Sequence, residues 1–334
     1  MTASLAVFFL GGTIGMAGHR DGVVQRLGGD ALLAAVPQLA GLDATIRAHD
    51  FRAMPSACLT FDDILALVAA AEDAVAEGAT GIIVVQGTDT IEETAFGIDL
   101  VWPHEPPMVV TGAMRNPTLP GADGPANLLA AAQVAGDPQF AGLGCLVVLN
   151  DQVHAAQRVR KTHSASPAAF TSPDTGPLGH LVEGVPMLLA RPSGRTCVPR
   201  PASTADVRVA LVTLTLDDDG GLLTGIAARY AGLVVAGFGV GHAPAALAEP
   251  LGQLARRMPV VLASRTGAGS VFRHTYGFPG SETDLRKRGL IAAGFLDPYK
   301  ARVLLRLLLA GGADTAAVAD TFAAVGGPSF GGTE

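Results

Sequence analysis

The sequence contains few of the residues that build disulfide frameworks or zinc sites. Its three cysteines, Cys58, Cys145 and Cys197, are odd in number and too widely spaced for a CxxC motif. This spacing predicts reduced thiols, as in cytosolic proteins, rather than a disulfide framework. The eight histidines show neither HxxxH nor HxH spacing, so we expect no metal site.

Charge and long apolar runs are also scarce. Charged residues make up 16% of the chain, and the formal net charge is −7. This negative net charge, with only a short basic run at 158–161, argues against nucleic acid as a partner. The apolar run at 303–310 is interrupted by Arg306, so we expect no membrane partner. The N-terminus lacks a basic region and a small-residue cleavage site, which favours a cytoplasmic location.

Hydrophobic residues are abundant, at 49% of a 334-residue chain, which is enough to fill two cores. Continuous Val, Ile and Leu runs predict buried parallel strands alternating with helices. The expected strands are 5–10, 44–51, 81–85, 107–111, 144–149, 207–213, 232–236 and 259–264. We therefore predict two α/β domains with mainly parallel sheets, a larger flavodoxin-like N-terminal domain and a smaller C-terminal domain.

A Pro-, Ser- and Arg-rich stretch without periodicity predicts the boundary between these domains. We expect an N-terminal catalytic domain at 1–185, a linker at 186–206 and a C-terminal domain at 207–334. Two helices carry clear end signals. Thr60 with Asp63 predicts a capping box for a helix that stops near Gly78, and Asp297 followed by proline begins a helix that ends at residues 311–312.

Two glycine-threonine turns are the strongest chemical signal. FFLGGTIGM at 8–16 contains Thr13, and VVQGTDTIEET at 84–94 contains Thr88 and Asp89. Each follows a predicted parallel strand, and open α/β sheets place their ligands at the carboxyl ends of such strands. A threonine hydroxyl becomes a nucleophile when a neighbouring base takes its proton. Each turn by itself is better explained as a tight strand-to-helix connection with a threonine cap, and only the two turns together with the surrounding motifs favour a catalytic role.

Five separated motifs connect these turns to a known family. GGTIG, QGTDTIEETA, TGAMRNPTLPGADGPANL at 111–128, RKTHS at 160–164 and LDPYKARVLL at 296–305 together resemble the bacterial-type L-asparaginase family. The resemblance implies an amidohydrolase that converts L-asparagine to L-aspartate and ammonia, with possible minor glutaminase activity. It also implies that neither a metal nor an organic cofactor takes part.

The resemblance assigns catalytic roles to four residues. Thr13 matches the family's loop threonine, a candidate for attack on the side-chain amide. Thr88 and Asp89 match a second threonine and its aspartate, and Lys161 matches the lysine that completes a Thr-Lys-Asp relay. Burial would favour the neutral amine of Lys161, which could then accept the Thr88 proton, while Asp89 opposes that neutralisation. The sequence leaves open which threonine attacks first.

Asparagine carries an α-ammonium and an α-carboxylate, so its site needs groups of both kinds. The resemblance places Asp89 at the ammonium, together with Glu282 donated by a neighbouring subunit. Ser56 matches the serine that contacts the carboxylate, and Gly87 lies in the same substrate-binding turn. Glu282 could instead be a capping or solvated loop carboxylate, and Ser56 an ordinary loop serine after proline. A homodimer or homotetramer with its active site at a subunit interface is expected.

The chain departs from the family pattern at several positions. Leu10 stands where many relatives have threonine, and Gln86 where many have histidine. The loop at 15–29 contains no tyrosine, although many relatives use one to orient the loop threonine. Val240 replaces a frequent asparagine, with His242 close by, which predicts a different far wall of the pocket.

Two other functional classes share parts of this pattern. One is the amidase component of an aminoacyl-tRNA amidotransferase, which uses similar motifs but usually has an N-terminal extension and a partner subunit. The other is a non-catalytic amino-acid binding module. The presence of Thr13, Thr88, Asp89 and Lys161 together makes the hydrolase the leading hypothesis.

Overall fold

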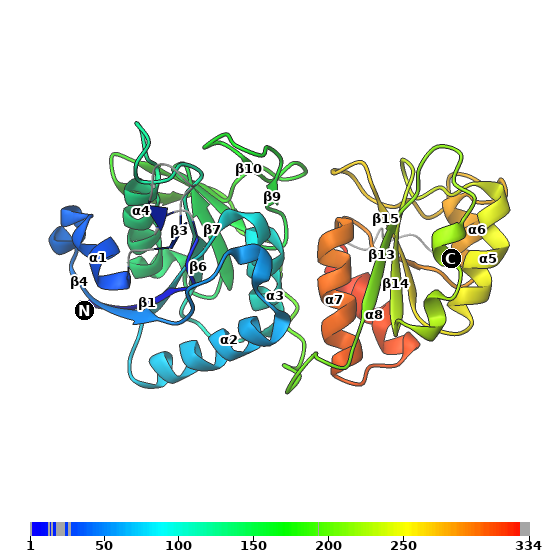
Figure 1. The fold of residues 1–334 in the computed structure, drawn as a ribbon, viewed down its shortest axis with the longest axis horizontal. Coiled ribbons are helices and arrows are strands. Elements are labelled where there is room, and N and C mark those ends of the chain that lie inside the picture. Colours follow the sequence, from blue (N-terminus) through cyan, green and yellow to red (C-terminus); the bar gives the residue numbers. More distant parts are fainter. Residues whose placement is uncertain are drawn as a thin grey trace. The chain divides into compact units, whose positions relative to one another are not determined.

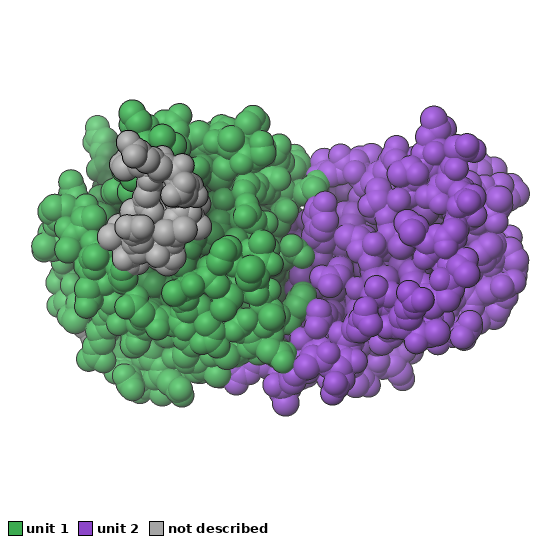
Figure 2. Space-filling model, viewed as in Figure 1, with its two compact units in different colours: residues 1–197 green, residues 198–334 purple. Residues whose placement is uncertain are grey.

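The computed structural model describes residues 2–12, 14, 16–17, 24–25, 28–192 and 194–327. The chain divides into two compact units, Met1–Cys197 and Val198–Glu334, each an α/β domain with its own sheet (Figures 1 and 2). The first unit contains the larger, mixed sheet, and the second contains a smaller parallel sheet. The predicted fold class is confirmed.

The N-terminal unit is built on an eight-stranded sheet of order β12-β11-β8-β7-β6-β5-β1-β4. Strands β4, β1, β5, β6 and β7 are parallel, and β8, β11 and β12 extend the sheet antiparallel. The bounds are β1 Ala3–Phe9, β4 Ala44–Asp50, β5 Gly81–Val85, β6 Met108–Thr111, β7 Cys145–Leu149, β8 Gln152–Ala155, β11 Gly179–Val182 and β12 Val185–Leu188. Two small ribbons, β2 Met16–Ala17 with β3 Val24–Gln25 and β9 Arg160–Lys161 with β10 Phe170–Thr171, lie outside the sheet.

Continuous apolar sequence explains why the parallel strands lie in the centre. Every residue of β5, β6 and β7 is buried, because helices cover both faces of the sheet. Residues that alternate along the strands, such as Val7, Ile83 and Val109, pack with the apolar face of α4. The opposite face contacts α2 and α3. The helices are α1 Gly29–Ala34, α2 Phe61–Ala76, α3 Ile91–Val101 and α4 Gly124–Gly136, with 3₁₀ turns η2 Pro37–Gly41, η3 Ser56–Cys58, η4 Thr88–Thr90 and η5 Pro138–Phe140.

Both predicted helix caps are present. Thr60 Oγ1 accepts from the Asp63 backbone N–H at 3.1 Å, and an Asp63 carboxylate oxygen accepts from the Thr60 N–H at 3.0 Å. The capping box opens α2, and the chain leaves the helix at Gly78 with φ 102°. Asp297 accepts from the backbone N–H groups of residues 299 and 300 and so begins α7, Pro298–Ala310. Local side-chain chemistry therefore sets these boundaries.

The C-terminal unit has a four-stranded parallel sheet of order β13-β14-β15-β16. One face packs with α5, α6 and the turns η6 and η7 in an apolar core, and α7 packs on the other face. The bounds are β13 Val209–Thr213, β14 Gly232–Gly237, β15 Val260–Ser264, β16 Ile291–Ala292, η6 Gly221–Leu223, η7 Ile226–Ala228, α5 Ala245–Ala255, α6 Glu282–Lys287 and α8 Thr315–Val325. Strand β13 is the edge that α7 approaches (Figure 1).

The N-terminal unit extends further along the chain than the sequence suggested. Strand β12 occupies the first residues of the expected linker 186–206, where it pairs antiparallel with β11. Arg195 then ties the following segment to α3, donating to Asp99 Oδ1 at 3.0 Å and to the Trp102 carbonyl at 2.8 Å. A four-residue strand and a single arginine are too short to give a hydrophobic periodicity, so the sequence of this stretch predicts a linker. The division between Cys197 and Val198 falls inside the expected range.

Two further observations concern the described part of the chain. No helix there has the length and apolar character needed to cross a membrane. All three cysteines are free thiols: Cys58 and Cys197 are exposed, and Cys145 is buried in β7.

Buried His154 makes the stability of the N-terminal unit depend on pH. Burial, with a smaller contribution from His180, lowers the pKa of His154 from 6.5 to about 4. Between pH 6.5 and 4 the unfolded chain binds the proton and the folded chain does not, so stability falls as pH falls. Because of this residue, we expect the unfolding free energy to be about 3 kcal/mol lower at pH 4 than at pH 6.5, as measured by urea denaturation.

The variant His154→Asn should show a shallower pH dependence than the wild type over the same window. His274→Asn, which changes an exposed histidine, serves as the matched control and should keep the wild-type slope. Parallel stability curves for the wild type and His154→Asn would contradict this assignment.

Candidate active site

The two glycine-threonine turns meet at the carboxyl edge of the parallel sheet. They follow β1 and β5, which are adjacent and in parallel register. Gly12 has φ +96°, and a Cβ placed on it would lie 2.2 Å from the Gly87 backbone nitrogen. Only glycine permits this approach, because any side chain at residue 12 would overlap the second turn. The turns are therefore in direct backbone contact.

Ser56 joins the same cluster from the segment that follows β4. A Cβ on Gly87 would lie 2.7 Å from Ser56 Oγ, and Thr90 Oγ1 donates to the Ser56 carbonyl at 3.2 Å. The serine is 2% exposed, and its hydroxyl has no hydrogen-bond partner among the described residues. A buried hydroxyl without a partner is costly, so it suits a ligand that supplies one.

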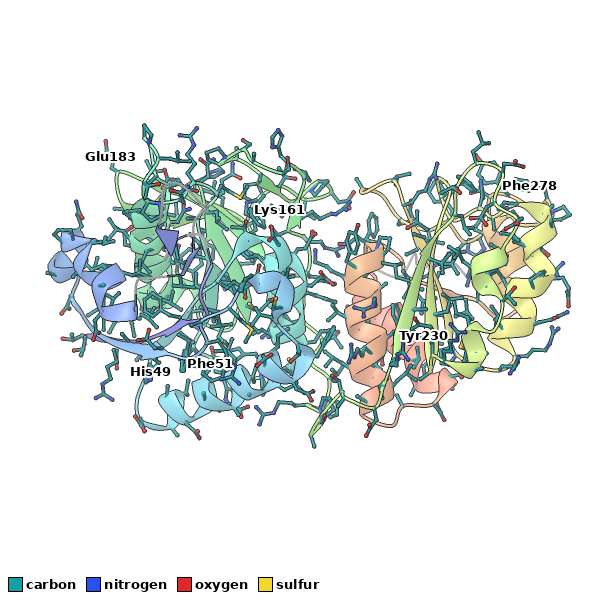
Figure 3. All side chains as sticks on the ribbon, viewed as in Figure 1. His49, Phe51, Lys161, Glu183, Tyr230 and Phe278 are labelled. Atoms are coloured by element: carbon teal, nitrogen blue, oxygen red, sulfur yellow. The ribbon has the colours of Figure 1, made fainter. Side chains whose placement is uncertain are left out.

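Lys161 reaches the second turn from the β9–β10 hairpin (Figure 3). Its Nζ lies 3.0 Å from Thr88 Oγ1 and 2.9 Å from Asp89 Oδ1. The Thr88 residue is 6% exposed and the Lys161 side chain 15%, whereas the Asp89 side chain is 68% exposed. The amine and the threonine hydroxyl thus lie below the surface, with the aspartate at the solvent side. These three predicted residues are brought together.

Glu92 was not predicted as part of the site, but it holds Lys161 in place. It lies in the first turn of α3, 8% exposed, and its Oε2 accepts from the Lys161 backbone N–H at 3.1 Å. The Arg160 Nε lies 3.9 Å from the same oxygen. A carboxylate at a helix N-terminus is stabilised by the helix dipole. The only sequence signal was an acidic residue in the first turn after QGTDT.

Gln86, which stands where relatives have histidine, lies beneath the second turn and is fully buried. Its Nε2 lies 3.3 Å from the Gly87 carbonyl, 3.4 Å from Thr90 Oγ1 and 3.3 Å from Thr94 Oγ1. Because Thr90 also contacts Ser56, the amide is linked to both predicted binding turns. The glutamine therefore serves as a polar support inside an otherwise apolar core.

The motif at 111–128 braces the neighbouring strand end. Asp123 accepts from the backbone N–H groups of Met114 at 3.0 Å and Arg115 at 2.8 Å. Asn127 donates to the Gly112 carbonyl at 2.9 Å from within α4. This loop is shaped by side-chain-to-backbone hydrogen bonds, which gives its Asp and Asn residues a structural role.

Glu282 lies in the C-terminal unit at the start of α6, and its side chain is fully buried. Its Oε1 accepts from the N–H groups of Thr275 at 3.0 Å and Tyr276 at 2.9 Å, and its Oε2 lies 3.3 Å from His242 Nε2. Burial alone would raise the pKa of Glu282, but these backbone hydrogen bonds outweigh it and lower the pKa below its ordinary value. The carboxylate is therefore ionised at neutral pH.

The His242 ring is held edge-on by two aromatic residues. Its centroid lies 4.9 Å from that of Tyr276 and 5.0 Å from that of Phe278. His242 thus contacts Glu282 directly. The Val240 carbonyl accepts from the Phe272 N–H at 3.0 Å. Whether these two residues change a wall of the pocket stays a prediction.

Thr13 and residues 15, 18–23 and 26–27 lie outside the described residues. The predicted role of Thr13, and the consequences of a loop without tyrosine, therefore stay predictions. The neighbouring Ile14 is described: it is 4% exposed, and a Cβ on Gly124 would lie 2.7 Å from its side chain. The first turn is thus anchored in the core on the far side of Thr13.

The arrangement suits proton transfer from a hydroxyl. An amine within 3.0 Å of Thr88 Oγ1 is at the distance that a general base needs to take its proton. Among the described residues, no group of three or more His, Cys, Asp or Glu side chains could hold a metal ion.

Two α/β units and a threonine-lysine-aspartate cluster at the edge of a parallel sheet define a two-domain protein with a threonine-centred site. The model of the family described as "Asparaginase, N-terminal" matches residues 4–193, and that of "Glutaminase/Asparaginase C-terminal domain" matches residues 208–322. The chain belongs to the asparaginase family.

Individual relatives match along nearly the whole chain. A probable L-asparaginase of Deinococcus radiodurans is 37% identical over 309 residues, covering 91% of this chain and 92% of the relative. A probable periplasmic L-asparaginase of Haemophilus influenzae is 32% identical over 319 residues, covering 92% and 88%. The crystal structure of a probable cytoplasmic L-asparaginase from Campylobacter jejuni superposes with a TM-score of 0.85 at 31% identity, covering 96% of this chain and 99% of the other.

The close approach of Gly87 to Ser56 is testable by stability measurements. In Gly87→Ala the new Cβ would overlap Ser56 Oγ, and such overpacking typically costs about 1–3 kcal/mol. We expect a lower Tm by calorimetry and recovery of at least half the loss in the double variant Gly87→Ala/Ser56→Gly.

Gly41→Ala provides the matched control, because nothing lies within 4 Å of a Cβ at that position. It should leave Tm nearly unchanged. If Gly87→Ala and the double variant lost the same amount of Tm, the new methyl group would not be in contact with Ser56.

Proposed function

We propose that this chain is an L-asparagine amidohydrolase that uses a threonine nucleophile to release L-aspartate and ammonia. The observation that carries the proposal is the position of Lys161 Nζ, within hydrogen-bond distance of both Thr88 Oγ1 and Asp89 Oδ1. In the relay, the Lys161 amine takes up the Thr88 proton, and Asp89 stabilises the ammonium. Thr13 is the second candidate nucleophile. No metal or organic cofactor takes part in this mechanism.

Recognition of the substrate divides between its two charged groups. Ser56 and Gly87 bind the α-carboxylate, which is consistent with a buried serine hydroxyl that lacks a partner among the described residues. Asp89 and the ionised Glu282 bind the α-ammonium. Because asparagine and glutamine differ by one methylene, worth about 1–3 kcal/mol in a pocket, we assign glutamine hydrolysis as a minor activity.

The protein acts in the cytoplasm as a homodimer or a homotetramer, with each active site completed by Glu282 of a second copy. Free cysteines and the similarity to a cytoplasmic enzyme support the location, although a periplasmic relative is equally similar in sequence. The backbone N–H groups of Thr275 and Tyr276 fix the position of the Glu282 carboxylate, as a residue that orients a substrate ammonium requires.

Ammonia release from L-asparagine tests the relay. Thr88→Ala and Lys161→Met should each lower kcat by at least about 100-fold, since both remove a group that moves the proton. Thr13→Ala, assayed for a burst of aspartate and for steady-state turnover, distinguishes the attacking threonine from its helper. Circular dichroism confirms that each variant is folded.

Lys287→Met is the matched control, because this lysine is exposed at the end of α6. It should retain wild-type kcat. If both Thr88→Ala and Lys161→Met kept their activity, the relay would be ruled out. If the wild type bound aspartate but hydrolysed no asparagine, a binding module would be favoured.

Subunit complementation tests whether Glu282 acts across an interface. Glu282→Gln should raise KM at least tenfold because it removes the charge that meets the α-ammonium. An equimolar mixture of Thr88→Ala and Glu282→Gln subunits forms hybrid dimers in which one of the two sites is intact. With random assortment, we expect about one quarter of wild-type activity to return.

Activity no higher than the average of the two parent variants would place Glu282 in its own subunit's site. Light scattering on the same samples establishes whether a dimer or tetramer is present.

A further inference from the structure

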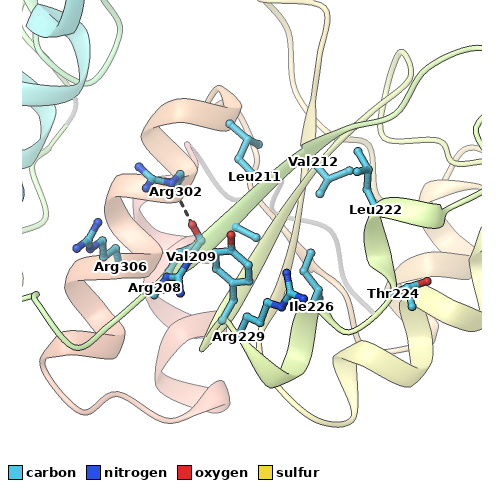
Figure 4. A pocket seen from close by; sticks show the side chains of 12 residues that line it. Arg208, Val209, Leu211, Val212, Leu222, Thr224, Ile226, Arg229, Arg302 and Arg306 are labelled. Carbon is cyan, nitrogen blue, oxygen red and sulfur yellow. Dashed lines mark hydrogen bonds between the residues drawn. The ribbon is translucent and has the colours of Figure 1, made fainter. Parts of the chain in front are cut away.

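A cavity of about 600 Å³ lies in the C-terminal unit, along the free edge of β13 (Figure 4). Its floor is the strand itself, and its walls come from α7 and from the segment around η6 and η7. Among the described residues, no aspartate or glutamate lines it, and four arginines do: Arg208, Arg229, Arg302 and Arg306. We call this the arginine cavity. A volume of this size suits a small ligand.

The arginines come from segments that are distant in the sequence. Arg208 precedes β13 and Arg229 precedes β14, whereas Arg302 and Arg306 lie one turn apart on α7. The lining gathers guanidinium groups from separate segments around one space, and guanidinium groups are the donors that bind carboxylates and phosphates in pairs.

Three of the guanidinium groups are held in place before any ligand binds. Arg302 Nε donates to the Val209 carbonyl at 3.1 Å, the bond marked in Figure 4, and Arg306 Nη2 donates to the Thr204 carbonyl at 3.2 Å. The Arg208 guanidinium stacks over the Tyr230 ring at 4.9 Å from its centroid. Groups ordered in advance lose less conformational entropy when they bind.

Protection of a strand edge explains only part of this arrangement. Arg302 covers an edge carbonyl of β13, which discourages pairing with another strand. Arg208 and Arg229 are exposed, and their side chains line the cavity together with Tyr230. Edge protection gives no reason for these two additional charges.

We propose that the arginine cavity binds a small dianion, a dicarboxylate or a phosphate, through Arg208 and Arg229. Each guanidinium can donate two parallel N–H groups to a pair of anionic oxygens. Arg302 and Arg306 line the same cavity from α7. The site is separate from Glu282, because Arg208 and Arg229 precede their strands while the His242 turn beside Glu282 follows the carboxyl end of β14.

Titration calorimetry on the whole chain tests the proposal, using inorganic phosphate, succinate and acetate at constant ionic strength. We expect a dianion to bind at one site per chain with Kd below about 1 mM. Arg229→Ala should weaken this binding about tenfold through loss of a charge-assisted pair, and Arg208→Ala should do the same. Phosphate binding without succinate binding identifies a phosphate site, and the reverse identifies a dicarboxylate site.

Arg257→Ala is the matched control, because it removes an exposed arginine of the same unit that does not line the cavity. It should bind as the wild type does. The proposal is overturned if neither dianion binds, if acetate binds as tightly as the dianions, or if Arg229→Ala and Arg257→Ala bind equally. An anion that bound at the Thr88 cluster instead would also bind Arg229→Ala and Arg257→Ala equally. Because the experiment measures anion binding alone, its outcome does not depend on whether the protein hydrolyses asparagine.

Discussion

The parallel pairing of β1 with β5 is the constraint on which the candidate site depends. Parallel strands end at the same edge, so the turn that follows each strand begins beside the other. The contact between Gly12 and Gly87 leaves no room for a side chain, and it fixes the distance between the two turns. Ser56 then packs against Gly87 from a third strand end. This backbone cluster therefore supports the hydroxyls of Ser56 and Thr88, which the proposed chemistry uses.

A second constraint is electrostatic. Lys161 is placed at the cluster by a two-residue strand, which has little rigidity of its own. The Glu92 carboxylate compensates by binding the Lys161 backbone, while Thr88 and Asp89 engage its amine. The lysine is thus held at both ends. A base positioned in this way needs no large rearrangement before it accepts a proton.

The C-terminal unit contributes charges of both signs at different places on its sheet. The Glu282 carboxylate is buried, ionised and supported by backbone N–H groups and His242. The arginine cavity lies along the edge strand, and among the described residues no carboxylate lines it. The carboxylate and the arginines of this small α/β domain each depend on residues that the sheet brings together from separate segments.

Sequence by itself determined eight of the parallel strands, the ends of helices α2 and α7, and the family. Continuous apolar runs predicted buried parallel strands, and the capping residues Thr60 and Asp297 predicted where helices begin, because these signals act between neighbours in the chain. The motifs also led to Thr88, Asp89 and Lys161.

Tertiary structure alone decided how those residues meet. Lys161 is separated from Thr88 by 73 residues, and the 3.0 Å contact exists only because a hairpin outside the sheet reaches the second turn. The support from Glu92 and the contact of His242 with Glu282 have no local pattern that encodes them. Each depends on strand register and on backbone approach between distant segments, and these are properties of the packed molecule.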